Sequence, residues 1–256
     1  MERRGLKPVR LISSDIDGTL AGDREASARF STFWHELEPD TRPLLVYNSG
    51  RLVDDILEFT AGEGLPQADF VIGGVGTMMV AENQPELSTA YSRSLSEGYD
   101  VDAIGAVLGA MDGIERQPAR YQHQHKSSWY FHDASNESLS DLEKRLEAEG
   151  LAVKVVYSSN RDLDILPANA DKGQALTWLC DRLGFGPDEA IVAGDTGNDG
   201  GMFVLPGIRG IIPRNGLDEL KARFDDPDFF YHASRAEADG VIEGLLHFRV
   251  PSPIRS

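Results

Sequence analysis

Short apolar runs alternate along most of the chain with segments of helical spacing. Such runs, ending at glycine or polar residues, are typical of buried parallel strands that carry helices on both faces of a sheet. Strands are predicted at Val9–Ser13, Pro43–Tyr47, Asp69–Ile72, Ala190–Ala193 and Gly207–Ile212. Helices are predicted at Ser27–Leu37, Leu52–Gly62, Lys172–Leu183, Gly200–Val204 and Asp239–Phe248. The alternation predicts an α/β fold with an open, mostly parallel, Rossmann-like sheet.

Residues 84–159 follow a different pattern. They predict a helix at Val101–Met111, a strand at Tyr121–Phe131, a helix at Leu139–Glu149 and a strand at Ala152–Tyr157. The alternation along the first strand would place one polar face on the sheet, formed by Gln122, Gln124, Lys126, Ser128 and Tyr130. We therefore expect a small α/β domain at 84–159, inserted into a core domain made of 1–83 and 160–256.

The composition narrows the classes of partner. A formal net charge of −17 disfavours binding to nucleic acid and to anionic membranes, because Lys and Arg clusters normally make such contacts. No apolar run approaches the roughly 20 residues that span a bilayer. The single Cys180 cannot form an internal disulfide, and residues 1–8 lack the apolar stretch of a signal peptide. These features predict a cytoplasmic protein that binds a small molecule.

Two acidic loops follow predicted strands. Asp15, Asp17 and Gly18 come directly after the first strand, and Asp195 and Asp199 follow the strand at 190–193. Because parallel strands present their carboxyl ends at one edge of the sheet, the loops can share one site. Carboxylate oxygens are the ligands that Mg²⁺ prefers, although each loop alone is also compatible with an ordinary acidic turn.

Two further positions suit an anion. Ser49 and Gly50 begin a predicted helix, where a hydroxyl and backbone N–H groups can bind phosphate, although serine also caps helices routinely. Lys172 begins another helix, where the helix dipole disfavours a cation unless an anion lies nearby. In so acidic a chain, a phosphate site needs local positive charge, which a lysine and a metal ion could supply.

The order of these four signals resembles the haloacid dehalogenase superfamily. Asp15-Ile16-Asp17-Gly18-Thr19 matches its first motif, Ser49 the second, Lys172 the third, and Gly194-Asp195-x-x-Asn198-Asp199 the fourth. The resemblance implies Mg²⁺-dependent hydrolysis of a phosphate ester through an aspartyl-phosphate.

The resemblance also implies a role for each matching residue. Asp15 would be the nucleophile and a metal ligand, and Asp17 the general acid and base, which also binds the metal through its carbonyl. Asp195 would bind the metal directly, and Asp199 directly or through water and Lys172. The phosphate oxygens would be held by Ser49, Gly50, Lys172 and Asn198.

Within that superfamily the chain is most similar to the sucrose-phosphate phosphatase group, which includes mannosylfructose-phosphate phosphatase-like enzymes. The supporting runs are Leu45–Arg51, Asp69–Thr77, Asp162–Pro167 and His232–Phe248. This group carries an α/β cap of the C2 type that recognises the sugar. The resemblance implies sugar contacts from Gln122, Gln124, Lys126, Tyr130, Asn160 and Asp162, whereas a solvated polar face is the alternative.

Several alternatives remain open at this stage. The group often has Asn in place of Gly18 and Ser in place of Thr196. The substrate could therefore be sucrose 6-phosphate, mannosylfructose phosphate, or a phosphate of the mannosylglycerate or glucosylglycerol type. A phosphomannomutase-like phosphotransferase and a non-catalytic sugar-phosphate sensor are rival functions. The oligomeric state is undetermined, and a monomer is compatible with the sequence.

Overall fold

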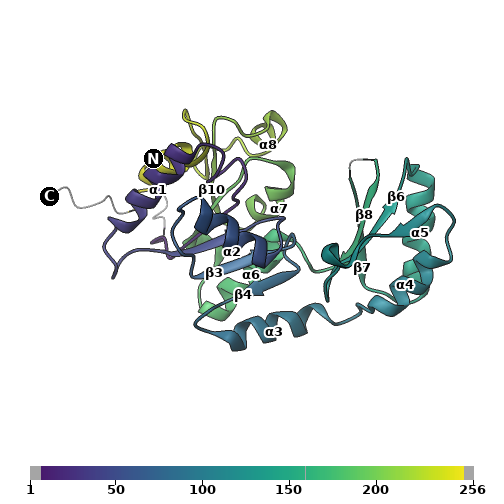
Figure 1. Cartoon of the computed structure of the whole chain (residues 1–256). Coiled ribbons are helices and arrows are strands. Elements are labelled where there is room, and N and C mark those ends of the chain that lie inside the picture. Colours follow the sequence, from purple (N-terminus) through teal and green to yellow (C-terminus); the bar gives the residue numbers. More distant parts are fainter. Residues whose placement is uncertain (1–6, 159, 251–256) are drawn as a thin grey trace. The chain divides into compact units, whose positions relative to one another are not determined.

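The structure of the chain, a computed structural model, describes residues 7–158 and 160–250 and consists of two compact units (Figure 1). The first unit comprises Met1–Pro85 and Asp171–Ser256, and the second comprises Glu86–Ala170. The insertion predicted at 84–159 thus begins close to the expected position but extends further along the chain. The reason is strand β8 (Asp162–Pro167), which pairs with strands of the second unit.

The first unit is built on a seven-stranded sheet with the order β11-β10-β9-β1-β2-β3-β4. All neighbouring strands are parallel except β3 and β4. The strands are β1 (Leu11–Ser14), β2 (Leu44–Asn48), β3 (Phe70–Gly73), β4 (Met78–Val80), β9 (Ala190–Ala193), β10 (Arg209–Ile212) and β11 (Phe230–His232). The predicted open, mostly parallel sheet is confirmed. Strands β4 and β11 were not predicted, because three residues are too few to establish a pattern.

Helices cover both faces of this sheet. They are α1 (Arg24–His35), α2 (Val53–Gly62), α6 (Lys172–Leu183), α7 (Gly200–Phe203), α8 (Asp218–Arg223) and α9 (Glu237–His247). One face carries Ile12, Leu45 and Ile191 into a core shared with α1, α2 and α9. On the other face, Ser13 and Asn48 contact the sulfur of Met202 in α7. Among the helices of residues 7–158 and 160–250, none is long and apolar enough to cross a lipid bilayer.

Helix α6 begins at a defined point, which fixes the position of Lys172. Asp171 is its N-cap, and the Asp171 carboxylate accepts a hydrogen bond from the N–H of Gln174 at 2.7 Å. Gly173 lies so close to the backbone of Gly201 that a Cβ at this position would collide with the Gly201 carbonyl. The first turn of α6 is therefore held against α7, and the Lys172 side chain starts from a fixed backbone.

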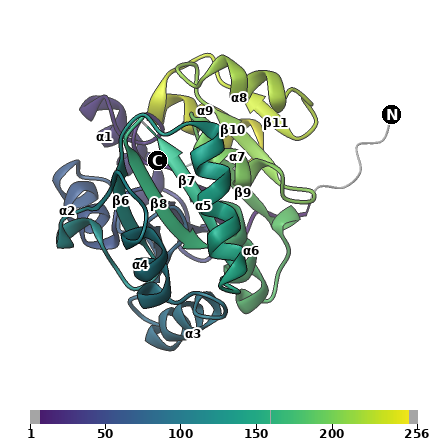
Figure 2. The same cartoon turned by 90° about the vertical axis from the view of Figure 1, so that its right-hand side faces the viewer.

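The second unit contains a four-stranded antiparallel sheet with the order β5-β6-β8-β7. Besides β8, the strands of this sheet are β5 (Ile114–Arg116), β6 (Ser127–Phe131) and β7 (Val153–Ser158). The helices are α3 (Pro85–Leu95), α4 (Val101–Gly109) and α5 (Asn136–Ala148). Figures 1 and 2 show α4 and α5 on the same face of this sheet. There Trp129, Leu163 and Ile165 pack with apolar residues of both helices, so the opposite face is left for polar side chains.

The predicted strand Tyr121–Phe131 is wrong in its first half. Only Ser127–Phe131 forms β6, whereas Ala119–Tyr121 is a 3₁₀ turn and His123 and Lys126 close a tight turn. The Gln122 amide donates to the carbonyls of Gln117 and Ser128 and accepts from the Ser128 N–H. The polar alternation thus reflects a turn held by side-chain hydrogen bonds, so Gln122 and Gln124 do not lie on a strand face.

Candidate active site

The predicted loops lie next to one another at one edge of the first sheet. Strand β1 lies between β9 and β2, so the residues after these three strands are neighbours at their carboxyl ends. These residues are Asp15 after β1, Ser49 after β2 and Asp195 after β9. A cavity of about 350 Å³ opens there, lined by Asp15, Asp17, Ser49, Gly50, Arg51, Thr196 and Asn198. This is where ligands bind in open α/β sheets.

Lys172 is the buried cation of this edge, with no exposed side-chain surface. Its Nζ donates to Asp15 Oδ1 at 2.8 Å and to Asp199 Oδ1 at 2.7 Å, and it lies 3.4 Å from Asn198 Oδ1. Burial would lower the pKa of Lys172, but the two carboxylates outweigh burial and raise it above its ordinary value. The lysine at a helix N-terminus is therefore explained by the anions that surround it.

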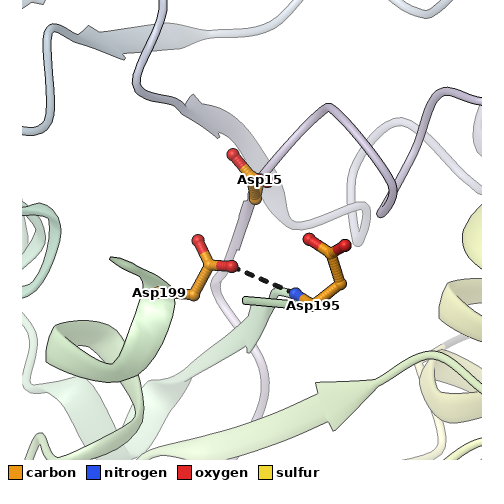
Figure 3. Close-up of side chains that lie close together, drawn as sticks. All are labelled: Asp15, Asp195 and Asp199. Atoms are coloured by element: carbon orange, nitrogen blue, oxygen red, sulfur yellow. Dashed lines mark hydrogen bonds between the residues drawn. The ribbon is translucent and has the colours of Figure 1, made fainter. Parts of the chain in front are cut away.

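Three carboxylates lie close together beside Lys172. Figure 3 shows their side chains, those of Asp15, Asp195 and Asp199. Oxygens of Asp15, Asp195 and Asp199 all lie within 4.8 Å of one another. Burial raises the pKa of Asp15 to about 7 despite the opposing effect of Lys172, and burial followed by repulsion from Asp199 raises the pKa of Asp195 to about 6. One ammonium facing three carboxylates leaves two negative charges unbalanced, and this oxygen-only donor set suits a hard divalent cation.

The three carboxylates differ in how many hydrogen bonds their oxygens already accept from the protein. Asp199 Oδ2 accepts from the backbone N–H of Asp195 at 3.0 Å (Figure 3) and from that of Thr196 at 3.0 Å. Its Oδ1 accepts from Lys172. Asp199 therefore shapes its own loop and orients Lys172. Asp15 and Asp195 are the better candidates for direct cation ligands.

Gly18 and Thr19 bring Asp195 close to the first loop. Gly18 has a φ of +76°, and a Cβ at this position would collide with the Asp195 carboxylate. The Thr19 hydroxyl donates to Asp195 Oδ1 at 3.2 Å. Asn215 adds a further link, since its amide donates to the Gly18 carbonyl at 2.7 Å. The sequence motif included Gly18 and Thr19 without revealing these contacts, and it gave no signal for Asn215.

The remaining cavity residues offer groups that can bind a phosphate. Ser49 is almost fully buried, and its Oγ accepts from the Arg51 N–H at 3.3 Å. The Asn198 side-chain carbonyl accepts from the Thr196 hydroxyl at 2.8 Å. The amide nitrogen of Asn198 is then the atom that can donate to a ligand. Because Thr196 acts through its hydroxyl, a serine at this position would supply the same bond.

Asp17 lies on the exposed side of the cavity, where Arg51 binds it. Both Asp17 oxygens accept from the Arg51 guanidinium, at 2.7 and 2.8 Å. In the sequence, Arg51 stands at the end of the run Leu45–Arg51 and no motif assigns it a role. Charge alone did not single it out, because an arginine in a helix-start loop is ordinary.

The six candidate sugar contacts lie in different parts of the second unit. Lys126 directly precedes β6, the half-buried Tyr130 lies on β6, and Asp162 of the neighbouring β8 pairs with Tyr130. The Gln122 amide is hydrogen-bonded within the turn before β6, whereas Gln124 and Asn160 are exposed turn residues. The open sheet face also carries Asp164, which the sequence did not single out; it accepts from Ser128 Oγ at 2.6 Å and pairs with Lys126 at 3.0 Å.

Comparison with known proteins supplies independent information. Residues 8–249 match the family described as sucrose-6F-phosphate phosphohydrolase. The chain is 51% identical to the mannosylfructose-phosphate phosphatase of Agrobacterium fabrum (strain C58 / ATCC 33970), over 95% of this chain and 98% of that protein. It is 31% identical to sucrose-phosphatase 1 of Nicotiana tabacum over 94% of this chain, and it spans 59% of the length of that relative.

A solved structure of a sucrose-phosphatase has a fold similar to that of this chain. The sucrose-phosphatase of Synechocystis sp. PCC6803, in complex with sucrose and phosphate, matches with a TM-score of 0.78 and 27% identity. The match covers 94% of this chain and 98% of that one. The predicted haloacid dehalogenase fold is thereby confirmed. The chain belongs to the sucrose-6F-phosphate phosphohydrolase family of the haloacid dehalogenase superfamily and is a phosphoric monoester hydrolase that acts on a sugar phosphate.

Proposed function

We propose that the protein hydrolyses a phosphorylated disaccharide with the help of Mg²⁺, through an aspartyl-phosphate on Asp15. The observation that carries this proposal is the buried Asp15 carboxylate, held 2.8 Å from Lys172 beside Asp195 at the wall of the cavity. Lys172 holds one Asp15 oxygen, which leaves the other as the nucleophile.

The reaction takes place in two displacements at phosphorus. In the first, an Asp15 oxygen attacks the phosphorus, the bond to the sugar oxygen breaks, and Asp17 gives that oxygen its proton. In the second, Asp17 takes a proton from a water molecule while the water oxygen attacks the phosphorus, and the bond between phosphorus and the Asp15 oxygen breaks. Inorganic phosphate leaves, the Asp15 carboxylate is restored, and Asp17 has regained the proton that it gave to the sugar oxygen.

The other cavity residues hold the phosphate. Negative charge on the phosphoryl oxygens is met by Lys172, Ser49, the Gly50 N–H and the Asn198 amide. Asp15, Asp195 and the Asp17 carbonyl would hold Mg²⁺, with Asp199 acting through Lys172 and its own loop. When bound, the ion supplies positive charge that stabilises the phosphoryl oxygens.

Mannosylfructose phosphate is the first candidate substrate, because the relative that carries this name is 51% identical over nearly the whole of both chains. Sucrose 6-phosphate is the second. The second unit serves as the cap that recognises the sugar, through the open sheet face carrying Lys126, Tyr130 and Asp162. Hydroxyl-binding side chains on a rigid sheet suit a sugar ligand.

Phosphate release from four substrates tests the proposal: mannosylfructose phosphate, sucrose 6-phosphate, fructose 6-phosphate and mannose 6-phosphate, each with Mg²⁺ and with EDTA. We expect release to require Mg²⁺. The values of kcat/KM should be higher for the two disaccharide phosphates than for the hexose phosphates, since two rings offer more contacts than one, and highest for mannosylfructose phosphate, the substrate named for the 51% identical relative. Equal values for disaccharide and hexose phosphates would contradict the substrate assignment. A phosphomutase would release no phosphate from sugar phosphate alone.

Asp15→Asn tests the nucleophile in the same assay. The amide keeps the size of the side chain but cannot form the aspartyl-phosphate, so we expect kcat to fall by about 10³-fold or more. Rapid-quench trapping of labelled phosphate on the wild-type protein, and its absence from the variant, provides the direct readout. Full activity of Asp15→Asn would exclude the proposed intermediate.

A further inference from the structure

Arg51 has an unusually complete set of contacts for a residue at the wall of the cavity. Its Nε and one terminal nitrogen donate to the two oxygens of Asp17 at 2.7 and 2.8 Å, and its other terminal nitrogen donates to Asp55 Oδ2 at 2.9 Å. The guanidinium carbon lies 4.0 Å from the ring centroid of Phe59. One face of the arginine is thus stacked and three of its donors are used.

These contacts make Arg51 a fixed support rather than a mobile surface charge. Asp55 and Phe59 both belong to α2, so the helix holds the guanidinium from two directions. Asp17, by contrast, is 52% exposed and lies in a loop, where a lone carboxylate would rotate freely. A planar fork that binds both oxygens sets the plane of the carboxylate as well as its position.

We propose that Arg51 is a positioning residue that holds the Asp17 carboxyl in the orientation from which it exchanges protons with the leaving sugar oxygen and with water. The proposal rests on the function proposed above for Asp17. Both Asp17 oxygens accept from the Arg51 guanidinium, so the arginine fixes the direction in which the carboxyl group faces.

The leaving group distinguishes positioning of Asp17 from binding of phosphate. A sugar alkoxide needs a proton in order to leave, whereas p-nitrophenolate leaves readily without one. Loss of Arg51 should therefore slow the first displacement with the sugar phosphate and leave the first displacement with p-nitrophenyl phosphate nearly unaffected, whereas the second displacement, in which Asp17 activates water, is common to both substrates. For Arg51→Gln we expect the single-turnover rate of leaving-group release to fall about 10-fold to 100-fold with the disaccharide phosphate and to change by less than about 3-fold with p-nitrophenyl phosphate.

The chain provides a matched control. Arg29 makes an equally bidentate pair with Asp239 at 2.8 and 2.9 Å, on α1 and α9 outside the cavity lining. Arg29→Gln should leave both activities unchanged. Arg51→Lys keeps the charge but loses the planar fork, so it should recover only part of the single-turnover rate that Arg51→Gln loses. Unfolding temperatures of all three variants verify that each remains folded.

Inhibition by inorganic phosphate gives a second readout that does not depend on p-nitrophenyl phosphate turnover. Unchanged inhibition in Arg51→Gln supports positioning. Weaker phosphate binding together with equal losses on both substrates would overturn the proposal in favour of direct phosphate binding by Arg51. Full activity of Arg51→Gln, or full rescue by lysine, would also overturn it. If Asp17→Asn showed no leaving-group selectivity, the role proposed for Asp17 would fail first, independently of Arg51.

Discussion

Each of the two units places a lysine among carboxylates, but with opposite electrostatic results. In the first unit, Lys172 is fully buried and faces Asp15 and Asp199, with Asp195 close by. In the second unit, Lys126 and its partner Asp164 remain 22% and 26% exposed. The first group has more negative charge than its lysine can balance, whereas the second is a balanced pair at the surface of a sheet.

The surroundings of the two groups extend this difference. On the second sheet, Asp162 accepts from Gln117 and Arg161, and Asp164 accepts from Ser128 as well as Lys126. In the first unit, burial and then repulsion from Asp199 raise the pKa values of Asp15 and Asp195. The carboxylates around Lys172 are therefore suited to an added cation and a phosphate. The sheet surface around Lys126 and Asp164 is hydrogen-bonded within itself and is suited to neutral hydroxyl groups.

Removal of each lysine should give the largest contrast. Lys172→Met leaves Asp15 and Asp199 buried without their ammonium, so we expect the free energy of unfolding at pH 8 to fall by about 3–5 kcal/mol without metal. Lys126→Met removes a partly exposed pair, so its cost should be under about 1 kcal/mol. Urea unfolding followed by intrinsic fluorescence measures both. Equal costs would show that the two groups do not differ as described.

The pH dependence of metal stabilisation tests the same contrast. The pKa values of Asp15 and Asp195 are raised from 3.8 to about 7 and about 6, so the folded state binds more protons than the unfolded state between pH 4 and pH 7. The contribution of these groups to stability therefore falls as pH rises through that window. Mg²⁺ competes with these protons, so it should stabilise the protein more at pH 8 than at pH 5.

Thermal unfolding with and without saturating Mg²⁺ measures this effect. At about 100 times the dissociation constant, binding is worth about 2.7 kcal/mol, which corresponds to roughly 5–10 °C at pH 8 for a chain of this size. At pH 5 we expect a rise of less than about 2 °C. Asp195→Asn should reduce the rise at pH 8, and Lys126→Met should not. A rise independent of pH would argue against binding at these carboxylates.

The sequence predicted the first unit far better than the second, for a physical reason. Buried parallel strands such as β2 and β9 are largely apolar runs. The strand order β9-β1-β2 then brings the loops that follow these strands together. The strands of the second unit mix polar and apolar residues, as in Asp-Leu-Asp-Ile at the start of β8, and the segment before β6 is organised by Gln122 rather than by a repeating pattern. The contacts of Arg51 with Asp17 and of Asn215 with Gly18 join distant segments, for which spacing along the chain carries no signal.

Gln122 offers the smallest and most local test of this difference. Its amide makes hydrogen bonds of 3.0 and 2.6 Å to the carbonyls of Gln117 and Ser128, and it accepts from the Ser128 N–H at 2.9 Å. Gln122→Ala should cost about 1–2 kcal/mol locally and speed hydrogen exchange of the Ser128 amide by about 5-fold to 30-fold. Gln124→Ala, the matched control, removes an exposed side chain that accepts one bond of 3.4 Å from Ser92, so its effect should be within about 0.5 kcal/mol. A rise in KM for the disaccharide phosphate in Gln122→Ala, with Ser128 exchange unchanged, would instead support the sugar contact that the sequence predicted.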